Sequence, residues 1–386
     1  MRADSLTPTP GGTARAARSG LAVLLLGIVP AAACLIIGVG LFTHTLGHAP
    51  LFDFHGGDWF AARRILDGRT PYELDYLRHR ADLIAQGAHP DPNIAVPAYP
   101  APALLLMVPF GLVSYTVAAV AFLLLATAAA AGSLWVLGVR DWRCYGALFL
   151  SYPVIHGLAL GALTSTLMLL TALAWRYRDR AVLAGSFAAA AIVLKLFLLP
   201  LLAWFVIARR TRAAVIAVLV SVVACSAGWA AIGFAGLTSY PEMLSLLSRT
   251  QERATYSVAS LLSAVGAASA PAQAAGAALG LALIAAAWRC ARGGGSEALV
   301  LALCLAASFA ASPILWSHYF ALLYVPIAIA APRLRAVWLA PALLWPPADP
   351  ASATWQIAVY LAAAAAVTAW VVFTARRVPA ARTAPA

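Results

Sequence analysis

The chain has 386 residues, of which 63% are hydrophobic and only 10% are charged. Apolar runs long enough to cross about 30 Å of hydrocarbon recur from Leu21 almost to the C-terminus, and this composition excludes an ordinary soluble domain. The formal net charge is +12, but the lysines and arginines stand in short clusters between apolar runs, which is a topology signal and not a nucleic-acid surface. We therefore expect a polytopic, all-α membrane protein with no nucleic-acid partner.

The basic clusters orient the apolar runs, because loops rich in lysine and arginine face the cytoplasm. This rule predicts about twelve spans, with a cytoplasmic tail at residues 1–20, a single membrane domain at 21–375 and a cytoplasmic tail at 376–386. The first apolar run, Leu21–Leu41, is longer than the apolar core of a signal peptide, about 7–15 residues, so we expect it to be retained as a span. It leads out to a long external loop, residues 44–99.

The runs after this loop are less regular. We expect a short span at Ala101–Leu112, a full span at Val117–Val139 and a broken span at Tyr145–Trp175. Two glycines, Gly157 and Gly161, would interrupt the broken span. This path leaves Arg140 and Arg143 on the external side, against the rule that places basic residues inside.

The middle of the chain predicts a hairpin. Residues 181–208 form two short apolar halves that meet around Lys195 and Pro200, because a basic cluster beginning at Arg209 returns the chain to the cytoplasm. The remaining predicted elements are a span at Ala213–Phe234, an external segment at 238–270, four further passes and a last span at Trp355–Phe373.

The segment richest in polar and charged residues follows the first predicted span. Asp53, His55 and Asp58 would lie at or just above the membrane surface, beside an aromatic segment that begins at Trp59 and has helical spacing. A carboxylate there could act as a general base toward a lipid-borne substrate. Each acid taken alone is equally compatible with a solvated loop carboxylate.

Two cationic or polar groups stand out in apolar surroundings. Lys195 lies within AIVLKLFLLPLL, where an ammonium needs a cavity or a charged partner such as a phosphate, or else snorkels to the interface. The segment Ser312–Pro326 places Trp316 and His318 at the outer mouth of a span. A histidine there could orient a phosphate or shuttle a proton, although an interfacial histidine that is merely hydrogen-bonded fits equally well.

Arg249 and Arg253 could form the rim of an anion site, although a solvated charged loop explains them as well. The five cysteines show no metal-ligand spacing, and no P-loop, HExxH or GxSxG motif is present. We therefore expect no cofactor, and the sequence leaves open whether a divalent cation assists.

Four motifs, in order, carry a resemblance to a known family. The first is Asp53–Phe54–His55 followed by Trp59, Ala61–Ala62, Leu66, Gly68 and Pro71–Tyr72, and the second is Tyr99–Pro100 with Pro102. The third is Lys195 with Pro200, and the fourth is Ser312–Pro313 with Trp316–Ser317–His318–Tyr319. On these motifs the sequence resembles glycosyltransferase family 87 of the membrane GT-C superfamily, whose members use polyprenyl-phosphate sugars and include mannosyltransferases and arabinofuranosyltransferases.

The resemblance implies a fold and roles for individual residues. The fold would be a GT-C-type bundle whose first external loop carries interfacial helices. Asp53 matches the acid that acts as catalytic base in the family, with Lys195 and His318 at the positions of its hairpin lysine and its histidine after the Ser-Pro turn. Donor phosphate would contact these two residues, with Arg249 and Arg253 adding positive charge. The lining of the substrate site would include His55, Trp59, Tyr99 and Trp316.

Two departures from the family pattern matter. The interval from Asp53 to Gly68 is one residue longer than the family leads us to expect, which makes Asp58 a rival for the base. The usual Gly-Gln-x-Asn signature of the fourth span is replaced by the sequence that runs from Gly161 to Ser165, which puts acceptor or donor contacts from that span in doubt.

The expected function is transfer of a sugar, mannose or arabinofuranose, from a polyprenyl-phosphate donor to a lipid or cell-envelope glycan acceptor. The reaction would invert the anomeric centre on the extracytoplasmic face of the plasma membrane, among membrane lipids. A lipid or solute transporter or flippase is the alternative, and it predicts polar residues spread through the bilayer midplane, whereas Lys195 is nearly alone there. A scaffold without catalysis would tolerate replacement of the external acids.

Overall fold

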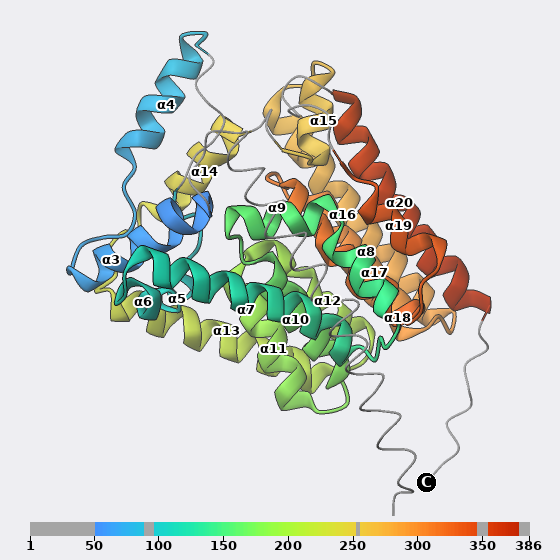
Figure 1. The fold of residues 1–386 in the computed structure, drawn as a ribbon. Coiled ribbons are helices and arrows are strands. Elements are labelled where there is room, and N and C mark those ends of the chain that lie inside the picture. The colour runs from blue at the N-terminus through green and yellow to red at the C-terminus, as the bar shows by residue number, and fades with distance from the viewer. Residues whose placement is uncertain (1–50, 89–95, 252–254, 346–353, 378–386) are drawn as a thin grey trace, which may run out of the picture.

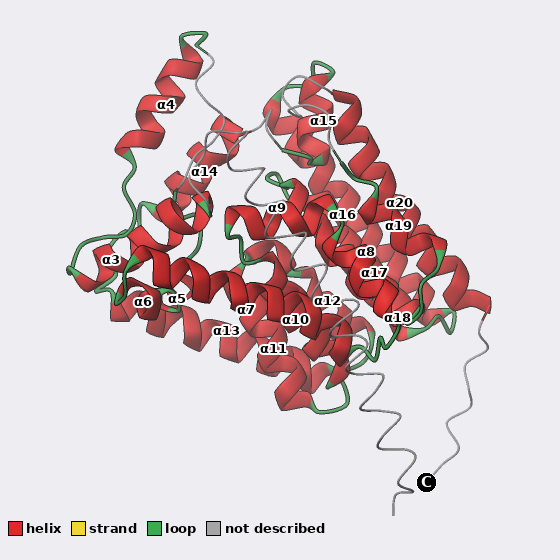
Figure 2. Ribbon diagram, viewed as in Figure 1, coloured by secondary structure: helices red, strands yellow, loops and turns green. Residues whose placement is uncertain are grey.

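The computed structural model describes residues 51–88, 96–251, 255–345 and 354–377. Within them the chain forms helices and loops with no strand (Figure 2). The predicted first span, Leu21–Leu41, lies outside the described residues.

The first half of the described chain contains η2 (Phe54–Trp59), α3 (Phe60–Leu66), α4 (Asp75–Ala85), α5 (Ala101–Leu105), α6 (Val108–Gly111), α7 (Tyr115–Val136), α8 (Trp142–Phe149), α9 (Tyr152–Leu160), α10 (Thr164–Arg176), α11 (Ala181–Leu194), η3 (Leu196–Leu198) and α12 (Pro200–Ile207). The second half contains α13 (Thr211–Ala231), α14 (Tyr240–Gln251), α15 (Val258–Ala264), α16 (Ser269–Arg292), α17 (Glu297–Ala311), η5 (Ser317–Leu323), α18 (Tyr324–Ala330), η6 (Ala336–Trp338), α19 (Leu339–Ala342) and α20 (Thr354–Arg377). Figure 1 shows α4, α14 and α15 toward one end of the bundle, with the last turns of α20 at the opposite end.

Four described helices, α7, α13, α16 and α20, are long and apolar enough to cross a membrane. A fifth candidate is the pair α9 and α10, which is bent by 118°. Shorter apolar helices of 10–17 residues, among them α11 and α17, pack with them. The chain is therefore a membrane protein, but the expected count of about twelve spans is not confirmed.

The predicted short span at Ala101–Leu112 is not one continuous helix, and a crossing there stays a prediction. The segment folds as two helices, α5 and α6, of five and four residues. Pro109 explains the break, because its ring clashes with the carbonyl four residues earlier and it has no N–H to donate. The second piece packs beside the external loop, where the Trp59 indole donates to the Phe110 carbonyl at 3.1 Å. The first piece packs against α13, since Pro102 fills the space that a side chain at Gly228 would need.

The segment that contains Arg140 and Arg143, which the sequence left on the external side, lies beside a second basic turn that contains Arg333 and Arg335. Asp141 pairs with Arg143 at 2.9 Å and accepts a hydrogen bond from the Leu334 backbone N–H at 3.0 Å. Leu334 stands between two arginines whose turn was predicted to be cytoplasmic.

The predicted break at Gly161 is confirmed, whereas the predicted break at Gly157 is not. Gly157 lies within α9, whereas Gly161 ends that helix with a left-handed backbone conformation, φ +75°. Glycine adopts this conformation without steric cost, and the closeness of η2 adds a second requirement, since a Cβ at Gly161 would stand 2.5 Å from the Phe54 Cβ. The Leu51 N–H donates to the Ala159 carbonyl at 3.0 Å. The bend thus fixes η2 against the end of α9.

The hairpin prediction is confirmed. The polypeptide leaves α11 at Lys195, which is extended (φ −152°, ψ 107°), and re-enters helix through η3 and α12. The two adjoining basic turns are held together by Arg210, which bonds the Arg178 carbonyl at 2.5 Å, Asp179 at 3.0 Å and Glu297 at 2.5 Å. This network fixes the basic ends of the hairpin and of α17.

Candidate active site

A π-helical turn brings the two acids of the external loop onto one face. Asp53 precedes η2, the π-helical segment Phe54–Trp59, and Asp58 lies within it. In an α-helix, residues five apart point about 140° away from each other, whereas the i→i+5 hydrogen bonding of a π-turn stacks them. The wider turn therefore keeps both carboxyl groups on one side of the segment.

Burial gives the two carboxyl groups different protonation behaviour. Desolvation raises the pKa of Asp53 to about 7, and the nearby positive charge of Lys195 opposes this rise. Desolvation raises the pKa of Asp58 well above its usual range, and the negative charge of Asp53 raises it further. Asp58 is 1% exposed, and neither of its carboxyl oxygens has a hydrogen-bond partner among the described residues. Of the two carboxyl groups, Asp53 is therefore the one that ionises more readily.

Three aromatic rings surround the Lys195 ammonium. Its Nζ lies 4.2 Å from the ring centre of Tyr99, 5.5 Å from that of Trp316 and 5.7 Å from that of Tyr319. Such faces attract a cation. No described carboxylate lies within ion-pair distance of Lys195, so its charge is not neutralised by a direct salt bridge in the described part of the chain.

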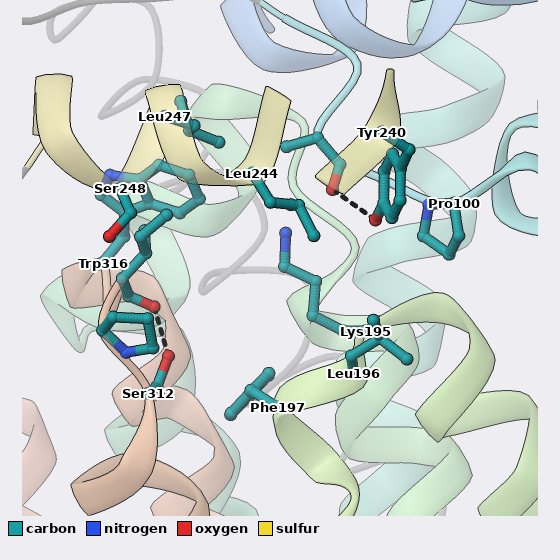
Figure 3. Close-up of a pocket in the computed structure, with 13 residues that line it drawn as sticks. Pro100, Lys195, Leu196, Phe197, Tyr240, Leu244, Leu247, Ser248, Ser312 and Trp316 are labelled. Atoms are coloured by element: carbon teal, nitrogen blue, oxygen red, sulfur yellow. Dashed lines mark hydrogen bonds between the residues drawn. The ribbon is translucent and has the colours of Figure 1, made fainter. Parts of the chain in front are cut away.

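Lys195 opens into a cavity of about 170 Å³. Figure 3 shows its side chain extending toward α14, which contributes Leu244 and Ser248 to the lining. Around the rim, the Tyr240 hydroxyl donates to the Ala98 carbonyl at 3.5 Å. The walls are mostly apolar and include Trp316, which makes the ammonium the principal charge among the described residues that line this space.

His318 lies one layer behind the cavity wall. It is 1% exposed, and its ring is 5.9 Å from Trp316 and 4.4 Å from Tyr319. Its Nδ1 has no hydrogen-bond partner in the described residues. Lys195 is close enough to act on it electrostatically. Lys195, Tyr99, Trp316 and His318, which the sequence placed far apart, therefore occupy one region.

Other predicted site residues lie elsewhere. His55 and Trp59 form an aromatic cluster with Tyr115, with ring centres 4.5 and 5.6 Å from that tyrosine, and neither lines the cavity. Arg249 is exposed on α14 and does not line the cavity either. Arg253 lies outside the described residues.

The structure also brings in residues that sequence reasoning missed. His156 Nδ1 is 2.6 Å from the Ser317 hydroxyl, and its ring is 5.8 Å from that of His318. Thr164 is 2% exposed, and its hydroxyl has no partner in the described region. The available signal was a polar side chain inside an apolar run, which is expensive unless it has a partner.

No group of three or more His, Cys, Asp or Glu side chains in the described ranges is arranged to hold a metal. The expectation that the protein needs no cofactor stays a prediction.

Comparison with known proteins gives one match. A family model for glycosyltransferase family 87 matches residues 98–317, which include Tyr99, Lys195 and Trp316; both acids and His318 lie outside the matched range. Searches of curated proteins and of solved structures gave no match. Because the matched range covers more than half of the chain, this membrane protein belongs to glycosyltransferase family 87.

Proposed function

We propose that the protein transfers mannose or arabinofuranose from a polyprenyl-phosphate donor to a lipid or cell-envelope glycan on the extracytoplasmic side of the plasma membrane. The observation that carries the proposal is the Lys195 ammonium, which faces a cavity within a cage of aromatic rings. An ammonium without a carboxylate partner is suited to a phosphate. Two carboxyl groups lie close enough to influence its charge.

The chemistry follows from this arrangement. The ionised Asp53 carboxylate takes the proton of the acceptor hydroxyl, whose oxygen forms a bond to the anomeric carbon of the sugar. The bond from that carbon to the phosphate oxygen breaks, and its electron pair leaves with polyprenyl phosphate. A single displacement inverts the anomeric centre. Lys195 stabilises the phosphate charge, with His318 close behind it and Arg249 and Arg253 as proposed rim charges.

The assignment of the base favours Asp53 over Asp58. A general base works best when its pKa lies near the working pH, as the pKa of about 7 at Asp53 does. Burial and the negative charge of Asp53 raise the pKa of Asp58 well above its usual range, so Asp58 is the weaker choice for an ionised base.

A second cavity supports a lipid donor. It has a volume of about 860 Å³ and is lined by apolar residues of α15, α16, α17 and α20. Phe309 lines this cavity, and its ring centre lies 6.5 Å from that of Phe197, which lines the Lys195 cavity. One lining ring of each cavity thus stacks on the other, and we propose that the polyprenyl chain occupies the larger cavity.

The direct test is an assay of membranes that contain the protein, supplied with polyprenyl-phosphate mannose or polyprenyl-phosphate arabinofuranose. Wild type should transfer the sugar, and Asp53→Asn should lower the rate by at least about 10²-fold, the usual contribution of a general base. Asp58→Asn, the matched change five residues away, should retain more activity. Full activity in both variants would remove the proposed base, and movement of lipid without sugar transfer would indicate a flippase instead.

A further inference from the structure

Two buried polar side chains in the described chain flank Gly157. A Cβ at Gly157 would stand 3.2 Å from the His318 Cβ and 3.9 Å from the Thr164 Cβ, so both side chains lie next to this glycine. The Thr164 hydroxyl and His318 Nδ1 each lack a hydrogen-bond partner among the described residues, although their residues are 2% and 1% exposed. Native proteins rarely leave such groups unpaired, which points to a missing hydrogen-bonding ligand.

The chemistry of this notch differs from that of the Lys195 cavity. A phosphate oxygen only accepts hydrogen bonds and is best held by a cation, the role proposed for Lys195. A threonine hydroxyl both donates and accepts, and a histidine Nδ1 does either according to its tautomer. The matching ligand group is a neutral hydroxyl, which also donates and accepts.

The position of this notch beside the Lys195 cavity indicates which molecule supplies the hydroxyl. The His318 ring lies 5.9 Å from Trp316, which in turn borders the Lys195 cavity. A sugar bonded to a phosphate in that cavity would therefore reach the notch before any other part of the donor. Thr164 begins α10 directly after the bend at Gly161–Leu163, so the bend brings its hydroxyl to this region.

We propose that Thr164 and His318 form a notch that binds a hydroxyl of the sugar being transferred, and that Gly157 keeps the notch open. Thr164 is then a specificity-determining residue. This inference rests on the proposed function, since it takes the phosphate to be held at Lys195.

The test compares two lipid probes on the purified full-length protein: polyprenyl phosphate without a sugar, and the polyprenyl-phosphate sugar, mannose or arabinofuranose, that wild type binds more tightly. Thr164→Val removes the hydroxyl at almost constant volume. It should weaken binding of the sugar-bearing lipid roughly tenfold, the usual value of one hydrogen bond, and leave binding of the sugar-free lipid unchanged. Thr171→Val is the matched control on the same helix, because the buried Thr171 hydroxyl is already bonded to the Leu167 carbonyl at 2.8 Å.

Gly157→Ala provides a second reading that keeps both polar groups. The added methyl group should narrow the notch and weaken only the sugar-bearing probe. In Gly132→Ala, the control, the new methyl group would meet only a leucine methyl at an ordinary distance of 3.6 Å, and both probes should bind as to wild type.

Three outcomes are decisive. Unchanged binding of both probes to Thr164→Val would mean that water alone fills the notch, and equal weakening of both would mean a structural role; either overturns the inference while the proposed function stands. If the Lys195→Met variant binds both probes as wild type does, the proposed phosphate site is wrong, and the notch argument falls with it.

Discussion

Two groups of charged residues in this protein contrast in how they are paired. At the basic end, Arg210 contacts Asp179, Glu297 and a backbone carbonyl, and Arg178 also pairs with Glu297 at 3.5 Å. At the other site, Lys195 is surrounded by aromatic rings.

The difference separates structure from chemistry. Charges satisfied by one another stabilise a particular arrangement of the chain, and little is left over for a ligand. Buried groups whose hydrogen bonds are unmade in the described structure are costly, and such groups gather where a substrate completes them. Both Asp58 carboxyl oxygens and the Tyr319 hydroxyl are in this state in the described residues. We therefore expect substitutions at the basic end to lower stability, and substitutions around Lys195 to lower activity.

The largest effect should come from Lys195→Met, which keeps the length of the side chain and removes the charge. Loss of one preorganised electrostatic contact to the leaving phosphate should lower the transfer rate by about 10²–10³-fold, while the midpoint of thermal unfolding holds or rises because a buried charge is removed. A rate assay with a polyprenyl-phosphate sugar and a melting curve in detergent would measure both. A variant that unfolds at a lower temperature but transfers sugar at the wild-type rate would show that Lys195 serves stability and not catalysis.

The pH dependence should be the next largest effect. Because burial raises the pKa of Asp53 to about 7, its ionised fraction, and with it the rate, should rise about tenfold between pH 6 and pH 8 and then level off. The rate rises with pH because the ionised Asp53 carboxylate is the active form. Asp58→Asn should keep this rising profile, since Asp53 is the group that ionises more readily. A rate that is flat from pH 6 to pH 8 in wild type would rule out Asp53 as the titrating base.

Arg210→Met should affect stability instead of catalysis. It leaves Glu297 and Asp179 without their hydrogen-bonded partner in a partly buried network, which should cost about 2 kcal/mol of the free energy of unfolding. The activity of the protein that remains folded should be unchanged. Arg212→Met removes the same charge from an exposed position two residues on, and a loss of stability as large as that of Arg210→Met would show that net charge, and not the network, is responsible.

The smallest effect should be at the pair of Arg78 and Glu242, which joins α4 to α14 at 2.9 Å. Hydrogen bonding to Arg78 lowers the pKa of Glu242, but both side chains are about half exposed and their attraction is screened by salt. Glu242→Gln should leave the melting temperature and the transfer rate unchanged at physiological ionic strength. A clear drop in either would mean that this contact positions α14 over the cavity.

Part of the fold and part of the candidate site could be predicted from the sequence, because certain residues and runs differ sharply in hydropathy from their neighbours. Lys195 stands nearly alone as a charge in an apolar run, so its place at a hairpin break was predictable. The long uniform runs at α7 and α13 were equally clear. Pro109 should have warned against one continuous helix at Ala101–Leu112, but a rule based on hydropathy counts proline as only mildly unfavourable.

The rest depends on packing that no local pattern encodes. The joint orientation of Asp53 and Asp58 requires a π-turn, and α-helical spacing would have separated them. The nearness of Thr164 to His318 depends on the 118° bend after α9, and the ring contact of His156 with His318 joins residues on two different elements. His55 and Trp59 lie in the predicted loop yet belong to an aromatic packing cluster with Tyr115.

The most direct measurement is a structure of the purified protein with bound polyprenyl phosphate, determined by electron cryomicroscopy. The account predicts a phosphate oxygen about 2.8 Å from Lys195 Nζ, the length of a charge-assisted hydrogen bond, with the Asp53 carboxylate facing the same chamber. A phosphate bound at the arginines of the basic end, with the Lys195 cavity empty, would contradict it.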